Sequence, residues 1–197
     1  MISSYRLGDL VILSLNEEEK NEILLQYPHS IASNYIKMKK DSDNNIDIIT
    51  KIVLEHIEEN IDLLPKDIDN STLIHLRLGD VVRGNEWHEK MKRPVHPTYL
   101  QKIIPNNNDK IYVIGKCFFA KTSSTNYDEC ISASNKYLDN VLNTFNAEYI
   151  DSGNADIDLC CAVKAKVFIQ GRGHFSKLIL EIRKKLNLKC IETSCTD

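Results

Sequence analysis

The spacing of apolar residues along the chain changes near residue 65, and the two parts predict different structures. In the first part, apolar side chains recur every three to four residues from Ile49 to Leu64, which brings them to one side of a helix. The pattern predicts an amphipathic helix over residues 46–64, ended by Pro65 because proline cannot continue a helix.

Shorter segments precede this helix. The apolar run over residues 10–13 predicts a strand, and Asn16 followed by three glutamates predicts a helix start. The helical pattern breaks at Tyr27-Pro28 and resumes over residues 30–38. The polar stretch over residues 39–45 is interpreted as a linker.

After Pro65, short apolar runs alternate with helical patterns. Strands are expected at residues 73–78, 111–114, 148–150 and 167–170, with a last edge strand at Cys190-Ile191, and helices at 128–145, 155–163 and 174–186. This alternation predicts an α/β fold, a Rossmann-like parallel sheet with helices on both faces. Residues 1–70 are interpreted as a reduced N-terminal helical region and residues 71–197 as the Rossmann-like region, together forming one compact unit.

Composition and charge narrow the class of protein. The chain has 197 residues, of which 42% are hydrophobic and 27% charged, so collagen-like and fully disordered proteins are excluded. The net charge of −3 argues against a nucleic-acid binder. Basic residues gather between Lys164 and Lys189, where a positive field could attract an anionic small molecule, but the cluster at residues 183–185 is interpreted as a solvated helix face.

The cysteines and the N-terminal residues exclude further classes. The six cysteines form no CxxC pair and no zinc-type spacing with histidine, so we expect no metal site, and Cys160 and Cys161 are interpreted as core residues. No stretch has the length of a membrane span, and residues 1–15 lack the pattern of a secretion signal. A soluble, cytoplasmic protein is therefore expected.

Two segments carry candidate chemistry, and the first is the strand at residues 73–78. Period-two alternation places Leu73, His75 and Arg77 on one face. Ionisable residues in a buried parallel strand are costly without partners, and Arg77 near the carboxyl end suits the binding of a phosphate or pyrophosphate. The alternative is an edge strand with His75 and Arg77 in water.

The second segment runs from the strand at 167–170 through Gly171-Arg172-Gly173 into the helix that begins at His174. Backbone N–H groups at a helix start, with glycine beside them, form an anion site, and Ser176 can add a hydroxyl. The segment is neither the longer dinucleotide-binding pattern nor a P-loop. The segment is a candidate anion site because strand, loop and helix follow one another in the required order.

Residues 75–80 resemble the H-x-R-x-G-D motif of the fucosyltransferase superfamily that makes α1,2-, α1,6- and protein O-linked fucose. Residues 158–176 resemble a later block of that superfamily, in which an Asp opens a helix, an apolar strand follows and a Ser-bearing loop closes over the nucleotide. The resemblance covers about residues 72–186. It implies a GT-B fold of two Rossmann-like domains, whose donor, usually GDP-fucose, lies mainly in the C-terminal one.

The resemblance also implies roles for single residues. Arg77 would bind the β-phosphate and stabilise the leaving diphosphate, and His75 and Asp80 would shape the loop beside the phosphates, the three together forming the catalytic group. Asp158 would contact the nucleoside. The remaining nucleotide-sugar residues would be Gly79, Gly171, Arg172, Gly173, His174, Phe175 and Ser176. The implied reaction is an inverting sugar transfer to a glycan or other hydroxyl acceptor, without a metal or another cofactor, through electrostatic stabilisation of the diphosphate.

The chain departs from the family pattern in two respects. Leu78 stands where the family often has a second basic residue, and Gly171 to His174 replace a Ser-Thr or Ser-Ser pair, so Arg172 and His174 are candidates to supply the missing charge. Only about 70 residues precede the first motif, which leaves a reduced N-terminal domain. The chain is then a minimal transferase, a transferase completed by a second copy or a partner chain, or a silent nucleotide-binding or assembly module.

Candidate acceptor residues lie in the loop that follows the first motif. Glu86, His88 and His96 could supply a general base or bind acceptor, although exposed side chains in such a loop are most often only solvated. A strand ending in Gly-Arg-Gly-His is also seen in pyruvyltransferase-like sugar-modifying enzymes, which is the other enzyme reading. The motif at residues 75–80 argues against it.

Overall fold

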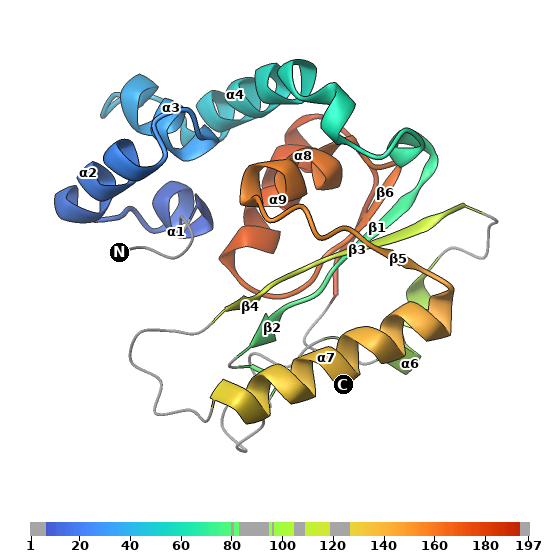
Figure 1. Ribbon diagram of the computed structural model, residues 1–197. Coiled ribbons are helices and arrows are strands. Elements are labelled where there is room, and N and C mark those ends of the chain that lie inside the picture. The colour runs from blue at the N-terminus through green and yellow to red at the C-terminus, as the bar shows by residue number, and fades with distance from the viewer. Residues whose placement is uncertain are drawn as a thin grey trace.

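The computed structural model shows a parallel sheet between two layers of helices (Figure 1). It describes residues 7–79, 81–82, 95, 97–104, 109–118 and 127–193. The main sheet contains β1 (Thr72–His75), β3 (Ile111–Ile114), β5 (Glu148–Tyr149), β6 (Val167–Ile169) and β7 (Cys190–Ile191). The α/β class, the parallel sheet and the coverage of both faces are confirmed, and the arrangement is consistent with a Rossmann-like fold.

The strand order is β5-β3-β1-β6-β7, and every neighbouring pair is parallel. The first strand in the chain is therefore the central one. Successive strands are added on one side of β1 as far as β5, and the chain then crosses to β6 on the other side. This reversal between β1 and β6 is the point at which open α/β sheets bind ligands, outside the carboxyl ends of the strands.

The strand expected over residues 73–78 is broken into two pieces. After β1 the chain leaves the main sheet and forms β2 (Leu78–Gly79), which pairs in parallel with β4 (Cys117–Phe118) beyond the end of β3. At the break, Gly115 packs on the carbonyl oxygen of Leu76 so closely that a Cβ would lie less than 3.0 Å from it. Only glycine fits there, and its φ of +151° also lies outside the range favoured by other residues.

One face of the sheet is covered by the N-terminal helices together with two later ones. Their apolar side chains join Leu73, Ile114 and Phe168 of the sheet in a single core. The helices are α1 (Leu7–Ile12), α2 (Glu17–Gln26), α3 (Ile31–Met38), α4 (Asn45–Glu59), α8 (Ala155–Lys164) and α9 (His174–Lys185), with 3-10 turns at Ile61–Leu63 and Ile68–Asn70. The buried carboxylate of Asp156 in α8 accepts a hydrogen bond from the backbone N–H of Ile31 at the start of α3 (3.0 Å).

The opposite face is covered by α6 (Pro97–Ile103) and α7 (Tyr127–Phe145). Leu100 and Val141 of these helices pack on Ile74, Val113 and Ile169 of the sheet. Because β1 contributes Leu73 to one core and Ile74 to the other, the predicted alternation of its two faces is confirmed.

Most predicted elements are confirmed to within a few residues, but the first strand is wrong. The run at residues 10–13 lies in and just after α1, where Leu7, Leu10 and Val11 share one buried side. A short apolar run fits a buried helix as well as a strand, and packing decides between them. The long helix ends at Glu59, five residues before the predicted end, and the polar stretch at 39–45 forms a turn that leads into α4.

Arg183 contradicts the interpretation of residues 183–185 as a solvated face. Its side chain is fully buried, and Nη1 donates to the carbonyl oxygens of Ala162, Val163 and Ala165 at 2.7–2.8 Å. These carbonyls belong to the last turn and the end of α8, where a helix leaves acceptors unpaired. A guanidinium with several donors satisfies them together. Lys184 and Lys185, in contrast, are exposed and form ion pairs.

Within the described ranges, no helix has the length and apolar character needed to cross a membrane.

Candidate functional site

The two segments singled out from the sequence meet at the reversal point of the sheet. β1 ends at His75 and β6 ends at Ile169, and these strands are neighbours. The chain that leaves β6 passes so close to β1 that a Cβ on Gly171 would lie less than 3.0 Å from both Nδ1 and the carbonyl oxygen of His75. Position 171 therefore has no room for a side chain, and only glycine fits there.

Gly173 brings the start of α9 against Arg77. A Cβ on Gly173 would lie 2.8 Å from Nη1 of Arg77, and its φ of +100° is one that other residues rarely adopt. Arg77 is partly buried and forms no ion pair with any residue in the described ranges. Its guanidinium thus lies beside the loop that precedes a helix N-terminus, where a phosphate would also be attracted by backbone N–H groups.

His75 lies deeper, on the same face of the sheet. Its side chain is only 8% exposed, and its ring faces that of Phe175 with 5.6 Å between the centroids. Burial, assisted by the charge of Arg77, lowers the pKa of His75 to about 4, so the imidazole is neutral near pH 7. The edge-strand alternative is therefore wrong for His75. Its Nδ1 is buried and has no hydrogen-bond partner among the described residues.

One side of the N-terminus of α9 is covered by α1. α1 packs on it so closely that a Cβ on Gly8 would lie less than 3.0 Å from the backbone of His174 and Phe175. Asp9, the next residue of α1, has its Oδ1 2.6 Å from Nδ1 of His174. A carboxylate near a helix N-terminus is favourable, but it also closes this side of the terminus to a second anion. A phosphate would consequently lie on the side of Arg77.

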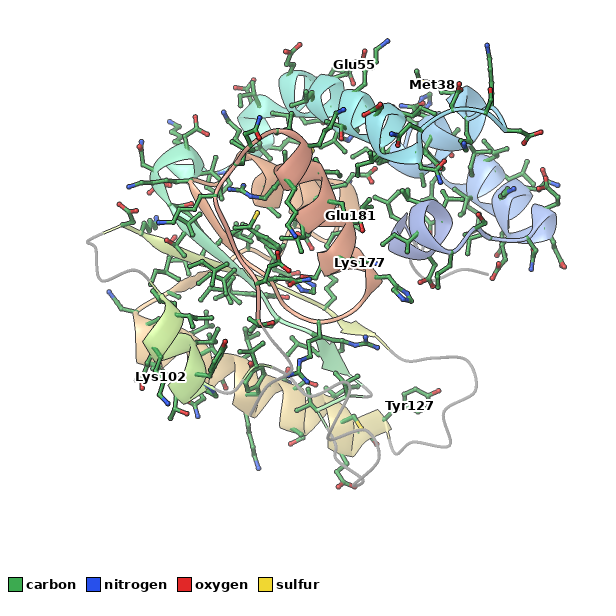
Figure 2. All side chains as sticks on the ribbon, turned by 180° about the vertical axis from the view of Figure 1, so that it is seen from behind. Met38, Glu55, Lys102, Tyr127, Lys177 and Glu181 are labelled. Atoms are coloured by element: carbon green, nitrogen blue, oxygen red, sulfur yellow. The ribbon has the colours of Figure 1, made fainter. Side chains whose placement is uncertain are left out.

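The other residues of the α9 segment face different surroundings. The side chain of Ser176 is fully buried, and its Oγ has no partner within the part of the chain that the structure describes. Lys177 and Glu181, labelled in Figure 2, belong to the exposed surface of α9, where they pair at 3.9 Å. Burial raises the pKa of Tyr137 of α7, and the positive charge of Arg172 partly opposes this rise.

Asp158 also lies along the edge formed by the carboxyl ends of the strands, but near the ends of β3 and β5. Its Oδ1 accepts a hydrogen bond from Ser152 Oγ at 2.6 Å. Burial raises the pKa of Asp158 to about 6, against the opposite effects of Ser152 and of the positive charge of Lys116. Asp158 is thus poised between its neutral and charged forms near neutral pH.

Lys116 is a residue of this edge that the sequence reasoning missed. The register that pairs His75 with Ile114 and Leu78 with Cys117 places Lys116 opposite Arg77. Its Nζ lies 3.8 Å from Asp151. A signal was present in the sequence, since Gly115-Lys116 follows a predicted strand as Gly171-Arg172 does.

The remaining predicted site residues either are engaged elsewhere, away from Arg77 and His75, or lie outside the described residues. The backbone N–H of Gly79 donates to Ser134 Oγ of α7 (2.9 Å), so this donor is engaged in packing. Asp80, Glu86, His88 and His96 lie outside the described residues. No group of three or more His, Cys, Asp or Glu side chains suited to a metal occurs in the described ranges. Burial raises the pKa of the Cys160 thiol and, to about 12, that of Cys161, as expected for core residues.

Chemically, the edge combines a partly buried guanidinium, a second cation opposite it, a neutral buried imidazole and a carboxylate that titrates near neutral pH. This arrangement can hold a polyanion at the reversal point and a hydrogen-bond donor farther along the edge. Comparison of the chain with protein-family models, with curated proteins and with solved structures finds no match in any of the three.

Proposed function

We propose that the protein is an inverting glycosyltransferase that uses a nucleotide-sugar donor, most similar to the fucosyltransferases, with Arg77 as the main diphosphate contact. The observation that carries the proposal is the position of this guanidinium. It lies against Gly173 at the reversal point of a parallel sheet and has no ion pair among the described residues. A diphosphate is the ligand that best matches such a cation.

The electrostatics of the edge support a leaving diphosphate. When the glycosidic bond to a nucleotide breaks, negative charge grows on the diphosphate, and fixed positive charge nearby lowers the barrier. Arg77 carries such charge, Lys116 stands at the position opposite Arg77 in the strand register with its ammonium 3.8 Å from Asp151, and Arg172 follows on the adjacent loop. His75 is neutral near pH 7 and adds no positive charge to this group.

The identity of the donor rests on the resemblance of residues 75–80 and 158–176. Within the proposal, the contact of Asp158 with the nucleoside is what the resemblance implies. The GT-B architecture, GDP-fucose as donor, a glycan or other hydroxyl acceptor and the acceptor roles of Glu86, His88 and His96 remain predictions.

Isothermal titration calorimetry tests the proposal with GDP, GDP-fucose, UDP and fucose 1-phosphate as ligands. We expect GDP and GDP-fucose to bind more tightly than the other two. Replacement of Arg77 by Ala removes charge-assisted hydrogen bonds to the diphosphate and is expected to weaken binding about 10- to 100-fold. Lys51→Ala is the control, because Lys51 is an exposed cation of α4 next to Glu55, which Figure 2 labels at the outer side of that helix.

Three results separate the alternatives. If none of the nucleotides binds, or if Arg77→Ala and Lys51→Ala bind GDP equally well, the proposal is wrong. If GDP binds through Arg77 and GDP-fucose is cleaved, the protein is an enzyme of the proposed class. If GDP binds through Arg77 but the donor is neither hydrolysed nor transferred, the silent nucleotide-binding module is the better description.

A further inference from the structure

We propose that His174, oriented by Asp9, is the general base that removes the proton from the acceptor hydroxyl in the sugar transfer. The inference rests on the proposed function. It adds a residue role that the resemblance does not supply, since the resemblance places His174 only in the phosphate loop.

The contact between Asp9 and His174 defines which nitrogen is available. Oδ1 of Asp9 lies 2.6 Å from Nδ1 of His174, a short hydrogen-bond distance. A carboxylate accepts the proton of Nδ1, and the lone pair of the neutral imidazole is then on Nε2. This is the arrangement by which a carboxylate sets the tautomer of a catalytic histidine. The His174 side chain is 48% exposed, so an acceptor can reach it.

The position of His174 suits attack at a sugar whose diphosphate is held by Arg77. His174 is the first residue of α9 and follows Gly173, which lies against the Arg77 guanidinium. An inverting reaction brings the acceptor to the side of the sugar opposite the diphosphate, so its base must lie across the sugar from Arg77. The Asp9 carboxylate holds the imidazole on the α1 side of the start of α9.

Other ionisable groups of this edge are less suitable. His75 is 8% exposed and Asp158 is 7% exposed, so neither is open to a glycan hydroxyl. Asp151 is exposed, but its carboxylate is already engaged by the Lys116 ammonium at 3.8 Å.

Anchoring of α1 does not explain the contact. Leu7, Leu10 and Val11 are each less than 5% exposed, and Gly8 packs directly on the backbone of α9. Burial of this apolar side already holds α1 in place. A partly exposed pair between a carboxylate and an imidazole adds little to stability. Its clear physical effect is to fix the orientation and tautomer of the ring.

The reaction transfers the sugar to the acceptor oxygen and one proton to His174. An oxygen lone pair of the acceptor hydroxyl forms a bond to the anomeric carbon, and the hydroxyl proton passes to Nε2 of His174. The bond between the anomeric carbon and the β-phosphate oxygen breaks, and its electron pair leaves with the nucleoside diphosphate. Asp9 stabilises the imidazolium, which returns its proton to solvent after the products depart.

The experiment measures release of GDP from GDP-fucose with water as acceptor, alongside binding of GDP-fucose by calorimetry. His174→Ala is expected to lower kcat about 10²- to 10⁴-fold while the donor Kd changes little, because the base acts only in the transition state. Imidazole added to the buffer is expected to restore part of the lost rate. Asp9→Asn is expected to lower kcat as well, again with an unchanged donor Kd.

Two exposed residues away from the site provide matched controls, His29→Ala for the histidine and Asp41→Asn for the carboxylate, and both should retain the wild-type kcat. The base assignment is overturned if His174→Ala keeps the wild-type kcat, or if its loss appears only in donor binding and does not respond to imidazole. A wild-type protein that binds no GDP-fucose or does not cleave it overturns the proposed function, and the base assignment with it.

Discussion

Replacement of Gly171 by Ala tests the central geometric feature of the candidate site, the approach of the β6 loop to β1. Gly171 has no backbone angle that other residues avoid, so conformational strain does not enter. The added methyl group would lie less than 3.0 Å from Nδ1 and the carbonyl oxygen of His75, whereas ordinary contacts begin at 3.4 Å. The backbone oxygen cannot rotate away, so the ends of β1 and β6 must separate.

The expected cost follows from this overlap. Extra methyl groups in a well-packed interior cost about 1–3 kcal/mol, and the upper end applies because backbone has to move. We therefore expect Gly171→Ala to lower the free energy of unfolding by about 3 kcal/mol. For a chain of this size, that corresponds to a fall in Tm of about 6–12 °C. Nucleotide binding should weaken as well, since Gly173 moves away from Arg77.

Urea denaturation, followed by circular dichroism, measures the change, and Gly153→Ala is the matched control. Gly153 has a φ of +67°, but the nearest atom to its Cβ is Lys116 Nζ at 4.0 Å. Gly153→Ala therefore introduces backbone strain without steric overlap, and we expect it to lower the free energy of unfolding by about 1–2 kcal/mol. The double variant His75→Ala/Gly171→Ala removes the imidazole and should be less destabilised than the sum of the single variants.

A Gly171→Ala protein as stable as the wild type, within about 0.5 kcal/mol, would refute the close approach of β6 to β1. Additive effects of the His75 and Gly171 substitutions would show that the imidazole does not face this glycine. The first result would also remove the support that the approach of β6 to β1 gives to the position of the loop beside Arg77.

Three further predictions concern buried charge, each measured by urea denaturation. Because burial lowers the pKa of His75 from 6.5 to about 4, its contribution to stability should be complete above pH 6.5 and fall by about 3 kcal/mol toward pH 4, measured as the difference between the pH profiles of wild type and His75→Gln; identical slopes would contradict this. Because burial raises the pKa of Asp158 from 3.8 to about 6, its contribution has the opposite sign and falls as pH rises through this range, so the two effects largely offset each other in the wild type. Asp158→Asn should therefore be about 2 kcal/mol more stable than wild type at pH 7 but not below pH 4, and equal stability at both would contradict the shift. Arg183→Met should lower the free energy of unfolding by about 3–5 kcal/mol, because it leaves buried carbonyls unpaired. The exposed control Lys184→Met should lower it by less than about 0.5 kcal/mol, and similar losses in the two variants would refute the capping role of Arg183.

Local sequence patterns predicted most elements because local interactions form them. Asn16 accepts a hydrogen bond from the backbone N–H of Glu19, and the Glu19 side chain completes the reciprocal capping box, as the run of glutamates suggested. The strand at Ile111–Ile114 was predicted with its observed bounds. The error at residues 10–13 arose because a short apolar run has no period of its own, and burial against α9 makes it helical.

The candidate site was predictable in its parts but not in its assembly. Strand periodicity placed His75 and Arg77 on one face, and the order of strand, glycine loop and helix identified Gly171 to His174. That these two segments are neighbours depends on the position of β6 beside β1, which local sequence does not encode. The same holds for Lys116, whose place opposite Arg77 follows from the pairing of β1 with β3.

By itself, then, the sequence determined most of the helices and strands, that the sheet is parallel and which residue types stand at its carboxyl ends, because hydrophobic period and turn chemistry act over a few residues. Only the tertiary structure decided the strand order, the burial of Arg183 and the meeting of Asp9 with His174, residues 165 positions apart. These depend on which apolar surfaces pack together, and that packing is a property of the whole chain.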